Sequence, residues 1–185
     1  MKEYKEIYEI VKNTLSEQRF LHSECVAARC VELAKIYGLD EEIARLIGIS
    51  HDVAKEMPNN EKIKYCMDNN LDIDDIEQIH PGLLHGKIAA DIGAKEYGFT
   101  EEMCSAIRCH TTGKANMSKL DKILYVADMS SADRQFPDKG YIIRLANENL
   151  DECVKYILKT GINERMEREK KVHLNSLRAL NYFLR

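Results

Sequence analysis

The segment from Ile43 to Asp52 reads IARLIGISHD, an apolar run that ends in an adjacent imidazole and carboxylate. Apolar residues at helical spacing predict a helix here, with His51 and Asp52 at its end. Neighbouring side chains on a helix point about 100° apart, because one turn holds about 3.6 residues. Both groups therefore reach one cation only if it lies between them, near a helix end or a kink. The segment predicts a metal site at that point, with Lys55 one turn further along the chain.

The length and composition favour one all-α domain. The chain has 185 residues, 44% of them hydrophobic, which is enough for a substantial single core. Three prolines and nine glycines interrupt it, and an apolar period of about 3.6 residues recurs from end to end, whereas strict alternation is almost absent. We therefore expect an all-α helical bundle and a single domain over 1–185. Its metal-site core is expected over about 19–137, with C-terminal helices over about 140–185 packed on it.

Helix start and stop signals locate the candidate ligands. Gly38 is typical of a helix end, and the acidic run from Asp40 is typical of a helix start. Ser118 and Asp121 resemble a capping box that opens a further helix. The predicted helices span about 3–15, 19–37, 40–52, 61–67, 82–97, 100–110 and 118–128, with a turn over 57–60 and a polar loop or short helix over 69–81. Five of the helices carry or end at an imidazole or a carboxylate: His22, the His51–Asp52 pair, His85, His110 and Asp128.

Charge and cysteine usage exclude several classes of protein. A formal net charge of −4 argues against a nucleic-acid partner. The six cysteines include no C-x-x-C pair and are expected to be free, packed thiols, which fits a protein of the cytoplasm. The charged start lacks a signal sequence, and no apolar stretch approaches about 18 residues, so no membrane partner is expected.

Four ligand candidates follow one another in the order H…HD…D, namely His22, His51, Asp52 and Asp128. Imidazole and carboxylate ligands from separate helical turns suit Fe, Mn, Zn, Ni or Co better than a thiolate site does. His85 and His110 add two further imidazoles. This order resembles the HD-domain metal-dependent phosphohydrolase superfamily, whose members have an all-α fold built around the same ligands.

Further segments extend the resemblance: LHGK over 84–87, AIRCHTTG over 106–113, MSKLDKI over 117–123, YVAD over 125–128 and RQFP over 134–137. Together they resemble the YqeK-type bacterial symmetrical diadenosine tetraphosphate hydrolases over about residues 19–181. One departure is visible: Met129 to Asp133 reads MSSAD, where the family usually has an aromatic residue, an apolar residue, Glu, Pro and a polar residue. This departure leaves the metal ligands untouched.

The resemblance implies a role for each candidate residue. It implies that a first divalent metal, iron, is held by His22, His51, Asp52 and Asp128. His85 and His110 would either hold a second metal, bridged through Asp52, or bind phosphate oxygens directly. It also implies that the following residues face the nucleotide: Lys55, Thr111, Arg134, Lys171 and His173.

The expected reaction is the symmetrical hydrolysis of diadenosine tetraphosphate to two nucleoside diphosphates. Asp52 would orient the attacking water and take its proton, and Lys55 would stabilise charge on the phosphates. Three alternatives stay open: a nucleotidase acting on mononucleotides, an oxygen-using diiron enzyme, and a nucleotide-binding module without turnover. The sequence also leaves open the metal's identity, one ion or two, the base preference and the oligomeric state, a homodimer included.

Overall fold

The computed structural model describes residues 1–184, and these form helices with no strand among them, as the sequence predicts. The α-helices are α1 (Tyr4–Thr14), α2 (Glu17–Tyr37), α3 (Glu41–Ser50), α4 (Asn59–Asp68), α5 (Asp75–Ile79), α6 (His85–Ile92), α7 (Glu101–Cys109), α8 (Lys119–Ser130), α9 (Lys139–Glu148), α10 (Leu150–Glu167) and α11 (Leu174–Phe183). A 3₁₀ helix, η1 (Pro81–Leu84), precedes α6, and a π-helix, η2 (Gly93–Tyr97), follows it.

The capping residues act as the sequence predicts. Gly38 ends α2 in the left-handed conformation, and the Asp40 carboxylate accepts the first free amides of α3. Ser118 and Asp121 form the reciprocal capping box of α8. The start of α2 lies earlier than predicted, because the Ser16 hydroxyl accepts the Arg19 amide and so moves the cap toward the N-terminus.

The stretch predicted as one helix over 82–97 is helical, but it is divided into η1, α6 and η2. The wide last turn lets the amides of Gly98 and Phe99 both reach the Gly93 carbonyl. The Phe99 ring packs on the bare Cα of Gly93, where a methyl group would lie 2.7 Å from the ring. The π-turn thus ends this helical stretch at the point where the Phe99 ring packs against Gly93.

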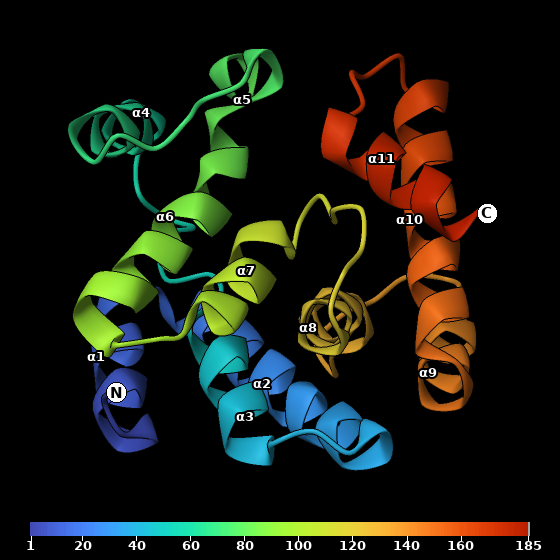
Figure 1. Cartoon of the computed structure of the whole chain (residues 1–185), viewed down its shortest axis with the longest axis horizontal. Coiled ribbons are helices and arrows are strands. Elements are labelled where there is room, and N and C mark those ends of the chain that lie inside the picture. Colours follow the sequence, from blue (N-terminus) through green and yellow to red (C-terminus); the bar gives the residue numbers. More distant parts are fainter. Residues whose placement is uncertain (185) are drawn as a thin grey trace.

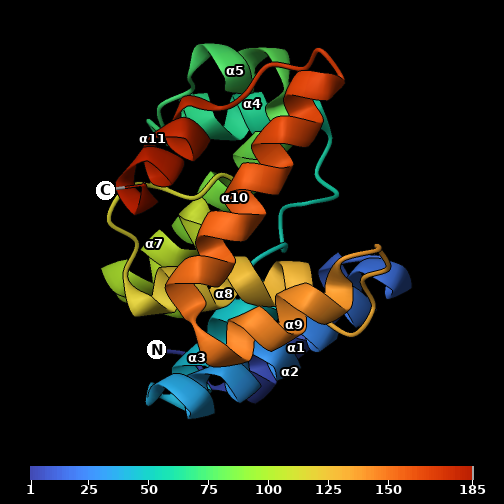
Figure 2. The ribbon, with the colours of Figure 1, turned by 90° about the vertical axis from the view of Figure 1, so that its right-hand side faces the viewer.

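Helix α8 occupies the centre of the bundle and contacts α2, α3, α7, α9 and α10. Figure 1 shows α8 end-on, with α2, α3, α6 and α7 on its left and α10 on its right. Figure 2 shows α10 running along the face opposite these helices, and α11 folding back beside it. The buried face of α8 includes Ile123, Leu124 and Val126, each 0% exposed. Asp128, on the last turn of α8, is therefore carried by a helix that five other helices contact.

The crossing of α2 and α3 depends on a glycine. A methyl group at Gly48 would lie 2.5 Å from the Ala27 Cα, too close for any real side chain. We expect Gly48→Ala to destabilise the protein by about 1–3 kcal/mol, because α3 must move away from α2 in a packed core. Chemical denaturation measures the change. Gly161→Ala is the matched control: a methyl group there meets nothing within 4 Å, so a stabilisation of about 0.5–1 kcal/mol is expected. An equal change in the free energy of unfolding for the two variants would contradict the close contact between α2 and α3.

Candidate metal centre

The site begins where α3 ends. His51 is the C-cap of α3, and the chain turns tightly from there, with the Lys55 amide donating to the Asp52 carbonyl over 2.8 Å. His51 is 0% exposed and Asp52 is 2% exposed. The two side chains thus lie at a helix end. Neighbouring residues inside a helix point in different directions, so this is where both can face one cation.

The imidazoles of the site share one orientation. The Nδ1 of His51 lies 2.7 Å from the Gly48 carbonyl oxygen, and the Nδ1 of His110 lies 2.7 Å from that of Ile107. In His85, Nδ1 lies 2.6 Å from the Gly82 carbonyl oxygen. A carbonyl only accepts, so each Nδ1 carries the proton and each Nε2 presents a lone pair. The outer ring nitrogen, here Nδ1, is the one that faces away from the site. Proteins orient metal-binding histidines by holding this nitrogen in a hydrogen bond.

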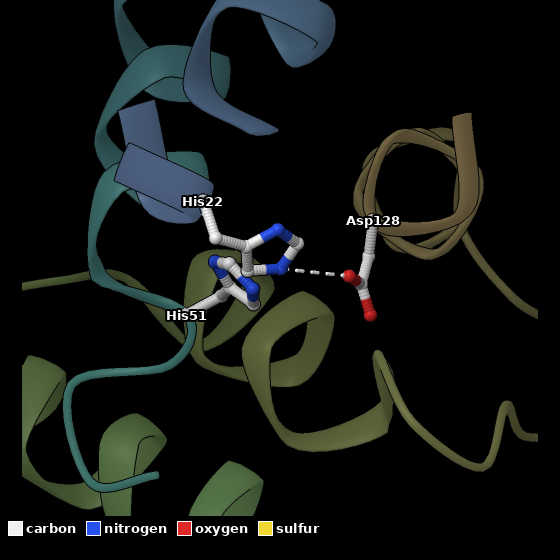
Figure 3. Close-up of side chains that lie close together, drawn as sticks. All are labelled: His22, His51 and Asp128. Atoms are coloured by element: carbon white, nitrogen blue, oxygen red, sulfur yellow. Dashed lines mark hydrogen bonds and ion pairs between the residues drawn. The ribbon is translucent and has the colours of Figure 1, made fainter. Parts of the chain in front are cut away.

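His22 and Asp128 approach the same region from α2 and α8. His22 Nε2 lies 3.1 Å from Asp128 Oδ1, and Figure 3 shows this contact beside the His51 ring. Ligand atoms of His22, His51 and Asp128 all lie within 4.8 Å of one another. A second such group, of His51, Asp52 and His110, shares the His51 ring with the first. Three of the four predicted ligands, His22, His51 and Asp128, thus form one group, and at the His51–Asp52 corner Asp52 joins them through His51, which belongs to both groups.

His85 and His110 lie on the other side of Asp52. Their Nε2 atoms are 3.1 Å apart, and Asp52 Oδ1 lies 3.1 Å from the first and 3.5 Å from the second. Lys55 Nζ lies 3.1 Å from His85 Nε2 and 3.5 Å from Asp52 Oδ1. The exposed hydroxyl of Thr111 lies 3.2 Å from His110 Nε2 and 3.4 Å from His85 Nε2. The cationic Lys55 side chain and the Thr111 hydroxyl therefore line the open side of the site.

Two atoms at this corner have no hydrogen-bond partner although they are buried. They are His51 Nε2 and Asp52 Oδ1; the donors near Asp52 Oδ1 do not meet it at hydrogen-bonding angles. An unsatisfied buried acceptor costs about 1–3 kcal/mol, so proteins rarely keep one without a reason. Two orphan acceptors among converging Nε2 lone pairs fit a divalent cation of borderline hardness. The residues present therefore fit the metal that the sequence predicts.

Burial and neighbouring charge set the protonation states. Full burial lowers the pKa of His51 to about 4, so this ring is neutral at pH 7, and burial also lowers the pKa of His85. Burial opposes the charged form of His22 as well, but the Asp128 carboxylate outweighs it and raises the pKa of His22. Burial of Asp52 and Asp128 is outweighed by the facing imidazoles, which hold the pKa of both carboxyls well below the usual range. Both carboxyls are therefore ionised at pH 7.

The residues predicted to face the nucleotide do not all lie together in the structure. Arg134 donates from Nε to the Asp128 carbonyl over 2.8 Å and pairs through Nη2 with the Asp128 carboxylate, so it borders the metal ligands. Lys171 is exposed on the segment before α11. His173 is buried and caps α11 by accepting the Asn175 amide at Nδ1, away from the metal ligands.

His173 belongs to a second cluster, which we call the α5–α11 latch: Asp74, Glu77, Lys87 and His173. His173 Nε2 lies 2.9 Å from Asp74 Oδ2, and Glu77 Oε2 accepts Lys87 Nζ over 2.6 Å. Asp74 and Glu77 also form the capping box of α5. Because His173 Nδ1 accepts an amide, its Nε2 carries the proton and offers no lone pair to a metal. The latch brings the caps of α5 and α11 together through the close approach of His173 Nε2 to Asp74, with the Lys87–Glu77 ion pair beside it.

A cavity of about 580 Å³ opens beside the site, between α8, α9 and α10. Thr111 lies at its end toward the metal centre, and its other walls include the Tyr125, Phe136 and Val172 side chains. Apolar and aromatic walls of this size suit a flat organic group.

Two residues near the ligands have no place in the sequence-based prediction. Arg19 Nη1 lies 3.4 Å from Asp52 Oδ2, and its position one turn before His22 on α2 is the signal that places it on the same helix face. Asp133 Oδ2 lies 2.7 Å from His22 Nδ1. It follows α8 in a loop, where no periodicity indicates which way a side chain points.

Comparisons with known proteins agree with this geometry. The family model of the HD domain matches residues 19–133. The chain is 33% identical to the symmetrical bis(5'-nucleosyl)-tetraphosphatase of Halalkalibacterium halodurans, over 95% of this chain and 94% of that protein. It is 29% identical to the protein of the same name from Bacillus subtilis, over 94% of each.

A solved structure shares the whole fold. It is a crystal structure from Clostridium acetobutylicum, described as a predicted HD superfamily hydrolase involved in NAD metabolism, with 33% identity and a TM-score of 0.96. The match covers 100% of this chain and 98% of that one. Within residues 1–184, no helix combines the length and apolar character needed to cross a membrane. The family and the helical fold expected from the sequence are thus confirmed, and the chain belongs to the HD domain family and, within it, to the family of the symmetrical bis(5'-nucleosyl)-tetraphosphatases.

Proposed function

We propose that this protein hydrolyses diadenosine tetraphosphate symmetrically to two nucleoside diphosphates. The observation that carries the proposal is the convergence of Nε2 lone pairs and ionised carboxylates on the His51–Asp52 corner, in a member of a family whose relatives bear this activity in their names. The Lys55 ammonium and the Thr111 hydroxyl, on the open side of that corner, supply the donors that a polyphosphate needs. We also propose that the protein works in the cytoplasm, because the six cysteines are free thiols.

The proposed ion is iron, held by His22, His51, Asp52 and Asp128. A divalent metal bound there supplies a water of lowered pKa and polarises a phosphoryl oxygen. The low pKa of Asp52 favours orienting that water over taking its proton. His85 and His110 would either hold a second ion together with Asp52 or, with a proton added at Nε2, bind phosphate oxygens directly, and the 3.1 Å between their Nε2 atoms fits a shared cation or proton.

The nucleotide is proposed to extend from this corner past Thr111 into the cavity of about 580 Å³. A flat base would pack against Phe136 and Tyr125, since rings in such pockets stack or meet edge to face. Val172 lines the cavity, so the segment over 171–173 is proposed to border the nucleotide. Lys171 would face the phosphates, whereas His173 would stay in the α5–α11 latch and act on the nucleotide only by fixing the position of Val172.

The test is product analysis. Protein loaded anaerobically with Fe²⁺ is incubated with diadenosine tetraphosphate in water enriched in ¹⁸O, and the products are resolved by chromatography and mass spectrometry. We expect ADP as the only product, with one label on half of the molecules, because symmetrical cleavage adds one water oxygen to one of two identical halves. The same protein treated with a chelator should be inactive. Parallel incubations contain AMP, dAMP and NAD.

Each alternative result would indicate a different function. Nucleoside and phosphate from AMP would indicate a nucleotidase, and AMP with ATP would indicate asymmetrical cleavage. Oxygen consumption tied to substrate loss would indicate a diiron oxygenase. Nucleotide binding without turnover at every metal loading would indicate a binding module. Any of these results overturns the proposal.

A further inference from the structure

His22 differs from the other histidines of the site in what holds its outer nitrogen. His51, His85 and His110 each present Nδ1 to a backbone carbonyl of their own helical turn. His22 presents Nδ1 to the Asp133 carboxylate, which lies 2.7 Å away and 111 residues later in the chain. The orientation of this one ring therefore depends on a side chain that is distant in sequence.

Asp133 is itself held in place. Its Oδ1 accepts the Ser131 hydroxyl over 2.7 Å, while its Oδ2 faces His22. The side chain is 26% exposed, against 5% for His22, so the carboxylate covers the outer edge of a buried ring. Asp133 thus presents to His22 Nδ1 a carboxylate oxygen whose position is fixed by the Ser131 hydroxyl.

We infer that Asp133 is a positioning residue that keeps the His22 proton on Nδ1 and the Nε2 lone pair directed toward Asp128 and the metal. This inference rests on the metal site proposed above. A carboxylate accepts more strongly than a carbonyl does, so His22 becomes a more basic ligand than a histidine held by the backbone. Without Asp133, His22 can exchange its ring nitrogens or rotate, and the site then loses one of its ligands.

The experiment measures metal affinity rather than turnover. The whole protein is titrated with Co²⁺ in competition with a chromogenic chelator, and the visible absorption of the bound cobalt is recorded. We expect Asp133→Ala to weaken Co²⁺ binding about 10- to 100-fold and to change the cobalt spectrum, because losing such an outer partner typically has that cost. Asp133→Asn should fall between the alanine variant and the unaltered protein, since an amide oxygen still accepts from Nδ1 without the charge.

Asp138→Ala is the matched control, because this carboxylate lies on the same connection and bonds the Tyr156 hydroxyl instead of a ligand. It should leave the cobalt affinity and spectrum unchanged. Thermal unfolding of the metal-free proteins shows whether each variant folds. If Asp133→Ala fails to fold, Asp133→Asn decides the matter.

Unchanged cobalt affinity in the folded Asp133→Ala variant, or in Asp133→Asn where only that variant folds, overturns the inference. An equal loss in Asp138→Ala also overturns it. Failure of the proposed function is a separate result: the unaltered protein would bind cobalt and depend on Asp133, yet leave diadenosine tetraphosphate intact.

Discussion

Asp52→Ala is expected to release the metal and to lower turnover of diadenosine tetraphosphate by about 10³-fold or more. Asp52 lies between His51 and the His85–His110 pair: its Oδ1 faces His85 and His110, and its Oδ2 lies 3.7 Å from His51 Nε2. A metal contributes several kcal/mol of charge stabilisation in the transition state, and about 1.4 kcal/mol corresponds to a tenfold change in rate. Metal analysis of the purified protein and the rate of ADP formation measure the two effects.

Glu56→Gln is the control for Asp52→Ala. Glu56 lies on the same turn, but its carboxylate accepts the Ser16 amide and hydroxyl over 2.7 Å each, outside the ligand cluster. It should keep its metal and its rate. Full activity of a metal-free Asp52→Ala protein would refute the assignment of Asp52.

Arg134→Ala is expected to keep its metal and to lose about 10- to 100-fold in nucleotide affinity. Hydrogen bonds to charged groups contribute about 1.5–3 kcal/mol, and the planar guanidinium can hold two phosphate oxygens at once. In the present arrangement Arg134 pairs with Asp128, which places its guanidinium at the border between the ligands and the open side. Binding of a nonhydrolysable dinucleotide, measured by calorimetry beside metal analysis, gives both quantities.

Arg134→Lys separates charge from shape. Lysine keeps the positive charge but lacks the fork, so its affinity should lie between those of Arg134→Ala and the unaltered protein. Tight nucleotide binding by Arg134→Ala would show that Arg134 serves only as the partner of Asp128.

The sequence predicts most of the fold because its local signals agree with its packing. Gly38, Asp40 and Ser118 each mark a helix end by their own chemistry, and the structure uses them so. The division of 82–97 into three kinds of helix escaped prediction, because it depends on the Phe99 ring meeting Gly93 in three dimensions. Periodicity reports which face is buried but not which carbonyl an amide reaches.

The sequence could predict that the candidate ligands lie near one another, because they are carried by helices and follow a known order. The residues that orient them were less predictable. Asp133 follows the last turn of α8, within the segment that departs from the family pattern, and nothing in its sequence neighbourhood points to His22. The surroundings of His173 were also hidden, since its partners Asp74 and Glu77 lie far away in the chain.

Through the α5–α11 latch, the last helix, α11, affects how firmly the backbone holds His85 in the candidate metal centre. Asp74 caps α5, a helix of only five residues, and α5 leads through η1 directly to His85. A truncation that removes His173 would therefore take away the partner of Asp74, so that α5 as well as α11 would be held less firmly. Amide hydrogen exchange should then be faster along α5 and η1. The backbone that positions His85 would be more mobile, although no residue near His85 had been changed.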